Sequence, residues 1–291
     1  MKLQDIKNSP LVRIKEEDGL AIVKYSRKCF YDNVWNNASL NSRGHVYDIT
    51  TGELIVRPFA KIFNHGENRT GFLTDGPYFV QDKINGFMGS VTKHNGKLIY
   101  STTGSLSSDF VALLQREVEK VPNLTKAFLD GFTYIFEVCV PEDPHIIPER
   151  EGLHFLCRIH IKTGIHYPFP NELKSFKFFV PHYYMMNKEG VLQLSKHRDI
   201  EGYVIWECHA GEKIARPSFK IKTTDYLIRK FLARGSAEKK AKIFDKTVNS
   251  FKIFDDEEMI PYVEYIRNNY TKEQFMEMSE QEVLQVLRNL K

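Results

Sequence analysis

The sequence predicts an α+β protein, in which a core of antiparallel sheet is followed by a small, entirely helical C-terminal domain. Two observations support this prediction. Short apolar segments with period-two alternation, separated by turn residues, fill most of the chain up to residue 223. From residue 224 onward the apolar residues recur at helical spacing instead. We therefore expect one domain over residues 1–223 and a second over residues 224–291.

The strand prediction depends on two hairpins and one long strand. The first hairpin turns at residues 50–52 and the second at Asn95-Gly96, a dipeptide that favours the tight turns of β-hairpins. Residues 132–140 alternate cleanly, with Phe132, Tyr134, Phe136, Val138 and Val140 on one face. A helix is expected over residues 108–119, between the second hairpin and this strand.

The C-terminal region of the chain has the spacing and the start signals of helices. Residues 279–282, Ser-Glu-Gln-Glu, form a capping box, which is typical of a helix N-terminus. The expected helices are 225–233, 237–249, 256–269 and 279–290.

Composition restricts the class of protein only broadly. The 291 residues carry a net charge of +4, which permits nucleic-acid binding without requiring it. The four cysteines form no CxxC pair, so we expect reduced thiols and no zinc site. The first residues lack the apolar core of a signal peptide, and no apolar run approaches the length of a membrane span. We expect a cytoplasmic protein, not bound to a membrane, and a monomer.

A lysine that follows a short apolar strand is the first candidate for chemistry. Gly86, three residues after Lys83, permits a tight turn into the next strand. This pattern alone more often belongs to a lysine in a surface loop. Other residues must therefore show whether Lys83 belongs to a catalytic site. Glu137 is one of them, because it lies within the apolar strand 132–140. A carboxylate there must be paired or line a polar pocket, unless it faces water at a sheet edge.

Charged residues on three other strands extend the candidate site. Glu201 precedes the strand 202–206. An acid at this position either binds a metal or a ribose, or simply marks the start of the strand without a function. Lys220 and Lys222 share one face of a strand and repel each other unless an anion lies between them. A triphosphate would supply that anion, although lysines also protect solvated edge strands. Arg57 ends an earlier strand, and its guanidinium can bind phosphate in bidentate fashion.

In this order the motifs resemble those of the covalent nucleotidyltransferases, the superfamily of DNA ligases, RNA ligases and mRNA capping enzymes. The matching segments are Lys83-x-x-Gly86, Phe136-Glu137-Val138, Glu201-Gly202-Tyr203-Val204 and Lys220-Ile221-Lys222. Upstream lie Ser42-Arg43-Gly44 and then Arg57-Pro58-Phe59-Ala60-Lys61-Ile62-Phe63-Asn64-His65-Gly66-Glu67. These two segments resemble the phage RNA ligase 1 class. The resemblance implies an ATP-grasp-like ligase core.

The resemblance implies an ATP-dependent RNA ligase of RNA repair, which joins 5′-phosphate and 3′-hydroxyl ends. Lys83 would attack the α-phosphorus of ATP, forming lysyl-AMP and releasing pyrophosphate. AMP would pass to the 5′-phosphate of RNA, and a 3′-hydroxyl would then displace it. Glu201 would help to hold Mg²⁺ or Mn²⁺. The residues implied to contact the nucleotide are Tyr25, Arg57, Lys83, Gly86, Glu137, Glu201, Lys220 and Lys222.

Two positions depart from the family pattern. Asn85 stands where the family usually has aspartate, so the charge that would bind the water shell of the metal is missing. Thr103 stands where the family often has lysine, which removes one cation but leaves a hydroxyl that can bond a ribose or phosphate.

Partners and alternatives follow from the same resemblance. The expected substrate is RNA, with tRNA as one candidate. An RNA end-healing kinase or phosphatase would be a partner. The resemblance also implies a viral protein that acts in the host cytoplasm. The basic segment 229–242 would steer an RNA backbone, or is an ordinary solvated helix surface. One alternative is a DNA ligase or capping-type enzyme, which normally carries a β-barrel after the last motif. The other is a non-catalytic RNA-binding module on the ligase fold.

Overall fold

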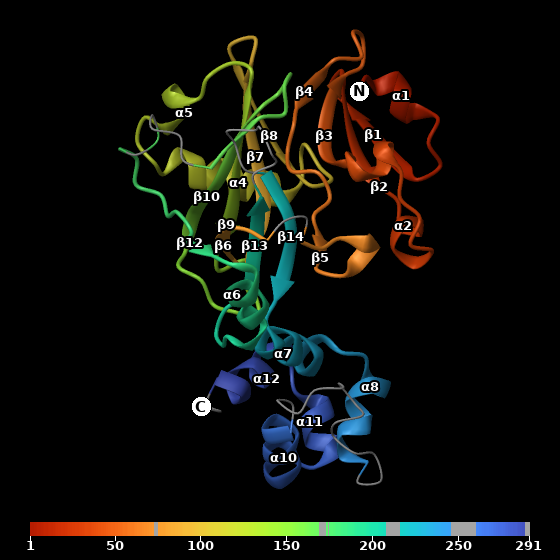
Figure 1. The fold of residues 1–291 in the computed structure, drawn as a ribbon, viewed down its shortest axis with the longest axis vertical. Coiled ribbons are helices and arrows are strands. Elements are labelled where there is room, and N and C mark those ends of the chain that lie inside the picture. Colours follow the sequence, from red (N-terminus) through yellow and green to blue (C-terminus); the bar gives the residue numbers. More distant parts are fainter. Residues whose placement is uncertain (73–74, 169–172, 174, 208–215, 246–259, 289–291) are drawn as a thin grey trace.

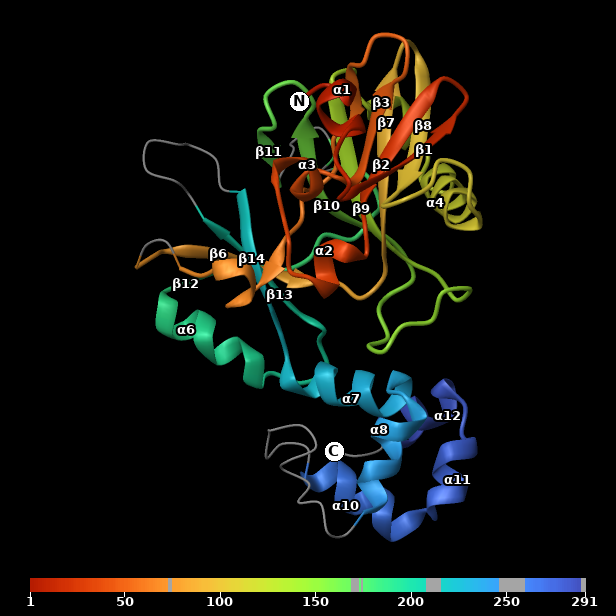
Figure 2. The same cartoon turned by 90° about the vertical axis from the view of Figure 1, so that its right-hand side faces the viewer.

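The computed structural model of the protein describes residues 1–72, 75–168, 173, 175–207, 216–245 and 260–288. In these ranges three mainly antiparallel sheets are followed by short helices at the C-terminal end (Figure 1). The α+β class predicted from the sequence is therefore confirmed. Strand β14 (Arg216–Lys222) runs directly into the first of these helices, and the helices gather beyond its end in both views (Figure 2).

The first sheet has the strand order β1-β2-β3-β4. Its strands are β1 (Val12–Glu17), β2 (Leu20–Tyr25), β3 (Arg43–Asp48) and β4 (Leu54–Val56). Helix α1 (Leu3–Lys7) packs its apolar side chains against this sheet. Two single-turn helices connect β2 to β3, α2 (Lys28–Tyr31) and α3 (Asn37–Leu40). The hairpin predicted at residues 50–52 is the antiparallel β3–β4 pair.

The second sheet has the order β11-β10-β9-β7-β8. Its strands are β7 (Phe87–His94), β8 (Lys97–Thr102), β9 (Phe132–Cys139), β10 (Gly152–His160) and β11 (His166–Tyr167). Helix α4 (Asp109–Glu119) packs against it through a face that includes Leu114, with α5 (Leu124–Ala127) alongside. The predicted turn at Asn95-Gly96 joins β7 to β8, and both residues have positive φ, as this tight turn requires.

The third sheet has the order β12-β6-β13-β14-β5 and is antiparallel except between β14 and β5. Its other strands are β5 (Phe63–Asn64), β6 (Tyr78–Lys83), β12 (Tyr183–Met186) and β13 (Gly202–Glu207). The short helical segments beside it are η1 (Glu67–Arg69), α6 (Lys188–Gln193) and η3 (Leu194–Lys196). A cluster of buried side chains joins this sheet to the second one, and its members are Phe59, Met88, Ile135, Cys157, Ile159 and Trp206. This shared core fixes the two sheets relative to each other.

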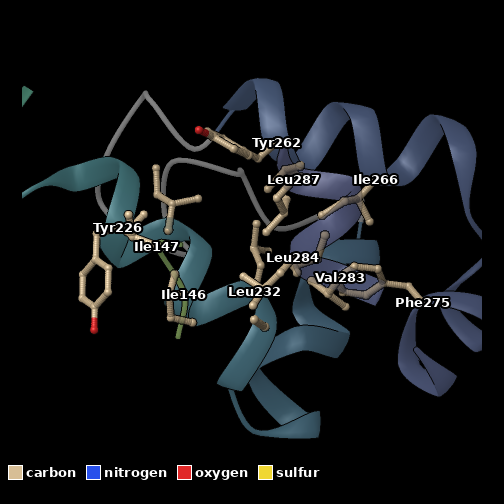
Figure 3. Packing of buried hydrophobic residues seen from close by; sticks show 14 residues of the cluster. Ile146, Ile147, Tyr226, Leu232, Tyr262, Ile266, Phe275, Val283, Leu284 and Leu287 are labelled. Atoms are coloured by element: carbon tan, nitrogen blue, oxygen red, sulfur yellow. The ribbon is translucent and has the colours of Figure 1, made fainter. Parts of the chain in front are cut away.

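Every described element after residue 223 is helical, as the sequence predicts. The helices are α7 (Thr224–Arg234), α8 (Ala237–Ala241), η4 (Lys242–Phe244), α10 (Ile260–Asn269), α11 (Lys272–Glu277) and α12 (Glu280–Arg288). Their apolar faces form one cluster, which also includes Ile146 and Ile147 from the segment after β9 (Figure 3). Three of the predicted helices extend into residues outside the described ranges, namely 237–249, 256–269 and 279–290.

The thiol prediction is confirmed where the structure describes the residues. Cys29, Cys139 and Cys157 are buried and free, while Cys208 lies outside the described ranges. Within the described segments of the chain, no helix combines the length and the apolar character needed to cross a membrane.

Candidate active site

The register of the third sheet brings Lys83, Glu201 and Lys222 together. Gly202 of β13 pairs with Lys83 of β6 on one side and with Lys222 of β14 on the other. The carboxylate of Glu201, one residue earlier, therefore lies between the two lysines. Its Oε2 is 2.6 Å from Lys83 Nζ, and its Oε1 is 3.3 Å from Lys222 Nζ. A side chain at Gly202 would collide with Ile221 of β14, so this close approach requires glycine.

Asn85 completes the surroundings of Glu201. Its side-chain amide donates to Glu201 Oε2 at 2.8 Å, and its Oδ1 accepts a bond of 3.0 Å from the Ile147 N–H. Its own backbone N–H donates to Glu149 at 3.0 Å. Asn85 is only 5% exposed, so both ends of its amide are satisfied inside the protein. An aspartate here would lack the donor to Glu201 and would place a second carboxylate beside it.

Glu137 reaches the same site from the second sheet. It lies opposite Met88 in the β7–β9 pair, and its Oε1 accepts a 3.2 Å bond from the Gly86 N–H. The pKa of Glu137 is raised because burial outweighs the nearby charge of Lys83. A Cβ at Gly86 would come within 2.5 Å of the Val138 carbonyl oxygen, so glycine lets this loop pack directly against β9.

Lys83, Gly86, Glu137, Glu201 and Lys222 line one pocket of about 580 Å³, where the second and third sheets meet the end of the first. Tyr25 reaches it from the end of β2, and its ring makes an edge contact with Trp35 at a centroid distance of 5.2 Å. Burial raises the pKa of Tyr25. The residues predicted from the sequence that line this pocket are Tyr25, Lys83, Gly86, Glu137, Glu201, Lys220 and Lys222.

The pocket concentrates positive charge that burial disfavours. The pKa of Lys220 falls to about 7, first because of burial and then because of neighbouring cations, of which Lys61 contributes most. Burial also lowers the pKa of Lys222, against the opposing effect of Glu201. An anion bound among these side chains would remove much of this penalty. The pocket therefore has the electrostatic properties of an anion site.

Lys83 differs from Lys220 because it already has an anionic partner. Burial acts to lower the pKa of Lys83, but the charges of Glu201 and Glu137 outweigh it and the net shift is upward. Burial alone would raise the pKa of Glu201, but the two adjacent lysines outweigh it and the net shift is downward. In the absence of other ligands, Lys83 is therefore a protonated ammonium in an ion pair, and this form is not nucleophilic.

Arg57 is the predicted contact residue that does not line this pocket. Strand β4 ends at Val56, and the backbone N–H of Arg57 bonds the Thr133 hydroxyl at 2.9 Å, so strand alternation does not continue past this point. The Arg57 side chain lines an adjacent cavity of about 300 Å³ instead. Its contact with the nucleotide phosphates therefore stays a prediction, made for a side chain that lies outside this pocket.

Several cations that line the pocket are not among the individual site residues predicted from the sequence. Arg43 and Lys61 both lie in the motif segments that resemble RNA ligase 1, so the signal was present but was not converted into a residue assignment. Thr103 lines the pocket as well. Lys230 enters it from α7, and only the fold could have revealed this contact between the helical segment and the site.

The donor set fits a metal that shares its coordination with phosphate oxygens. Among the described residues, no group of three or more His, Cys, Asp and Glu side chains could enclose an ion. Glu201 nevertheless places a carboxylate at the centre of the lysine cluster. Mg²⁺ retains waters and is commonly bound by one or two carboxylates plus substrate phosphates, so Glu201 is sufficient as the protein ligand.

Comparison with known proteins identifies relatives over much of the chain. RNA ligase 1 of bacteriophage TS2126 is 28% identical over 189 residues, which are 56% of this chain and 46% of that protein. A putative RNA ligase of Thermovibrio ammonificans is 24% identical over 215 residues, which are 69% of this chain and 56% of that protein. The chain thus spans about half the length of the curated relatives it matches.

A structural match and a family match complete the comparison. An archaeal ATP-dependent RNA ligase of known structure has a TM-score of 0.54 at 14% identity, and the match covers 98% of this chain and 75% of that one. At this identity the likeness shows the fold, which is that of the ATP-dependent ligases. The family model described as RNA ligase matches residues 41–227, well over half of the sequence. The chain is therefore a member of the RNA ligase family.

Proposed function

We propose that this chain is an ATP-dependent RNA ligase that carries AMP on Lys83 and joins 5′-phosphate to 3′-hydroxyl RNA ends. One observation carries the proposal. The register of β6, β13 and β14 gathers a lysine, a carboxylate and two further lysines in one pocket, as covalent nucleotide transfer requires. Membership of the RNA ligase family supports RNA ligation as the reaction, and so do the names of the relatives.

The size and charge of the pocket support ATP as the nucleotide donor. A volume of about 580 Å³ lies within the range of roughly 300–1,000 Å³ that is typical of small-molecule sites. Lys220 and Lys222 face the pocket together with Arg43 and Lys61. A triphosphate would add negative charge among these four cations, of which Lys222 is already paired with Glu201. Glu137, which also lines the pocket, would lie near the ribose, and Tyr25 would lie near the phosphates.

The chemistry begins at Lys83. Its Nζ would attack the α-phosphorus of ATP, so that an N–P bond forms while the bond to the pyrophosphate oxygen breaks. With Glu201 engaged by a metal ion, Lys83 would lose the 2.6 Å ion pair that raises its pKa, and its proton would pass to solvent before the attack. Lys220 and Lys222 would neutralise charge on the phosphates. A Mg²⁺ or Mn²⁺ ion bound by Glu201 would add Lewis-acid stabilisation of the phosphate oxygens.

The two later steps use the same pocket. AMP passes from Lys83 to the 5′-phosphate of RNA, and the 3′-hydroxyl of the second end then displaces AMP. Each step is a displacement at phosphorus, so positioning and charge neutralisation supply most of the catalysis. The substrate needs a 5′-phosphate and a 3′-hydroxyl, so an end-healing kinase or phosphatase would prepare ends that lack them. Broken tRNA is one candidate substrate.

The helical segment from residue 224 onward is proposed as a separate domain that recognises RNA. Its apolar faces form a cluster of their own, joined by Ile146 and Ile147 from the body of the protein. Lys230 of this segment lines the nucleotide pocket. The segment therefore lies close enough to position an RNA end at Lys83.

Labelling of the protein by ATP tests the proposal directly. The purified chain, freed of bound AMP, is incubated with α-labelled ATP and Mg²⁺ or Mn²⁺, denatured, and examined for acid-labile label. We expect label on the parent protein and on Lys97→Ala, a change at an exposed lysine on β8, and none on Lys83→Ala. Absence of label from the folded parent with both metals would overturn the proposal and favour a non-catalytic RNA-binding module.

A further inference from the structure

A second polar cavity adjoins the nucleotide pocket and has no role in the proposed nucleotide binding. Its volume is about 300 Å³, and Lys61 and Ile62 form a wall that it shares with the pocket of Lys83. On its other side it shares Asn41, His45 and Arg57 with a third cavity of about 220 Å³. The three cavities therefore follow one another across the protein, beginning at Lys83.

Arg57 lies where the second and third cavities meet and lacks a counter-charge. Its Nε is buried and makes no hydrogen bond, and burial lowers the pKa of its guanidinium. Among the described residues that line these two cavities there is no aspartate or glutamate. A guanidinium withdrawn from water without a carboxylate is unfavourable, so this arrangement is suited to an anion supplied from outside.

Two histidines in the second cavity show that the surroundings are positive. His45 is 3% exposed and its Nδ1 has no partner. Burial, and then the charges of Arg57 and Arg43, lower its pKa to about 3. Burial, and then Arg216 and Arg57, lower the pKa of His166 to about 4. Both imidazoles are therefore neutral at pH 7, where a neutral ring can still donate one N–H to an anion.

The backbone opposite Arg57 leaves room for its side chain. Gly164 has φ +73°, and a Cβ there would lie 2.4 Å from a terminal guanidinium nitrogen of Arg57. Glycine satisfies both the backbone conformation and the space requirement at this position. The guanidinium thus occupies a defined position against the segment that joins β10 to β11.

We propose that this cavity is a phosphate-binding subsite in which Arg57 grips a phosphate group of the ligase substrates. Assignment to ligase substrates rests on the proposed function, whereas anion binding by the cavity does not. Two sources share this chemistry, a phosphate of the RNA strand and the triphosphate tail of ATP. The RNA strand fits better, because the cavities continue away from Lys83 through a third one that a compact triphosphate would not need.

The experiment compares Arg57→Met with Arg13→Met, which removes the same charge from an exposed position on edge strand β1. Binding of a 5′-phosphorylated RNA oligonucleotide is measured by fluorescence anisotropy at several salt concentrations, without ATP. This readout requires no ligase activity, so it stands even if the proposed function fails. We expect about tenfold weaker binding for Arg57→Met and a salt dependence reduced by about one ion, with Arg13→Met unchanged.

A second measurement separates the two sources of phosphate. The rate of labelling by α-labelled ATP and the rate of joining of pre-adenylylated RNA, which needs no ATP, are measured on the same variants. Slower joining with weaker RNA binding assigns the site to the RNA strand. Slower labelling with unchanged RNA binding assigns it to the triphosphate.

The inference fails if Arg57→Met folds and changes neither RNA binding nor the labelling rate. If that variant does not fold, Arg57→Lys decides, because it keeps the charge but loses the planar fork that binds phosphate through two nitrogens. Weaker binding of RNA or slower labelling in Arg57→Lys supports the subsite. Unchanged values for both would overturn it.

Discussion

Replacing Asn85 by aspartate restores the usual family residue, and the structure predicts that it destabilises the metal-free protein. The change removes the amide that donates to Glu201 Oε2 at 2.8 Å. It places a second carboxylate next to that oxygen, at a position that is only 5% exposed. The bond that Oδ1 accepts from Ile147 can persist, so the perturbation acts mainly on Glu201.

Two contributions set the expected loss of unfolding free energy in Asn85→Asp. Losing a hydrogen bond to a charged group costs about 1.5–3 kcal/mol. Repulsion between the two carboxylates adds to this, but protonating one of them limits it. For an aspartate with pKa near 3.9, protonation at pH 7 costs about 4 kcal/mol. A protonated aspartate also regains a donor to Glu201. We therefore expect Asn85→Asp to lower the free energy of unfolding by about 2–4 kcal/mol at pH 7.

Urea unfolding of the parent, Asn85→Asp and Asn95→Asp measures this effect with EDTA and with Mg²⁺. Asn95→Asp adds the same charge at an exposed hairpin turn and should change stability by less than about 0.5 kcal/mol. The loss of unfolding free energy in Asn85→Asp, relative to the parent, should be smaller with Mg²⁺, which binds paired carboxylates. It should also become smaller as the pH falls from 7 to 5. Equal stability of parent and Asn85→Asp in EDTA at pH 7 would refute the reasoning.

Four further predictions follow from the site and its supports. Gly86→Ala should cost about 1–3 kcal/mol of unfolding free energy and abolish labelling by ATP, because its Cβ would press on the Val138 carbonyl; normal labelling would contradict this. Nucleotide binding near pH 8 should take up a proton, because phosphate raises the pKa of Lys220 from about 7 toward its ordinary value; calorimetry in two buffers of different ionisation enthalpy should therefore give different binding enthalpies. Free Lys220 disfavours folding below about pH 7, and this penalty fades as the pH rises toward 10, so the stability of the nucleotide-free protein should gain over that window in pH-dependent unfolding. Arg229→Ala should cost about 3–5 kcal/mol, because it leaves the 1%-exposed Asp225 without its closest cation; a loss below 1 kcal/mol in urea unfolding would count against it.

Turns, strand faces and helix starts could be predicted from the sequence because each depends on residues that are neighbours in the chain. Asn95-Gly96 set a tight turn, and period-two alternation placed Glu137 on the opposite face of β9 from Tyr134, Phe136 and Val138. The first C-terminal helix begins at Thr224, a single residue before its predicted start. In each case the pattern and the structure it specifies lie within a few residues of each other.

The site was predictable only as far as motifs fixed faces of strands. Lys220 and Lys222 face the pocket as alternation requires, but alternation does not extend beyond β4, so the sequence could not show that Arg57 lines the adjacent cavity. Lys230 reaches the pocket through tertiary packing, which no local pattern encodes. The contact between Asn85 and Ile147 is likewise non-local, and it shows how the chain accommodates asparagine at this position.

Joining of RNA ends is the most direct test of whether this chain is an RNA ligase with Lys83 as its nucleophile. A 5′-phosphorylated, end-labelled RNA strand with a 3′-hydroxyl is incubated with ATP, Mg²⁺ and either the parent, Lys83→Ala or Lys97→Ala. We expect joined or circular RNA with the parent and with Lys97→Ala, formed through adenylylated RNA, and neither species with Lys83→Ala. Joined RNA from Lys83→Ala would contradict the assignment of the nucleophile, and joining of DNA but not RNA would contradict the assignment of the substrate.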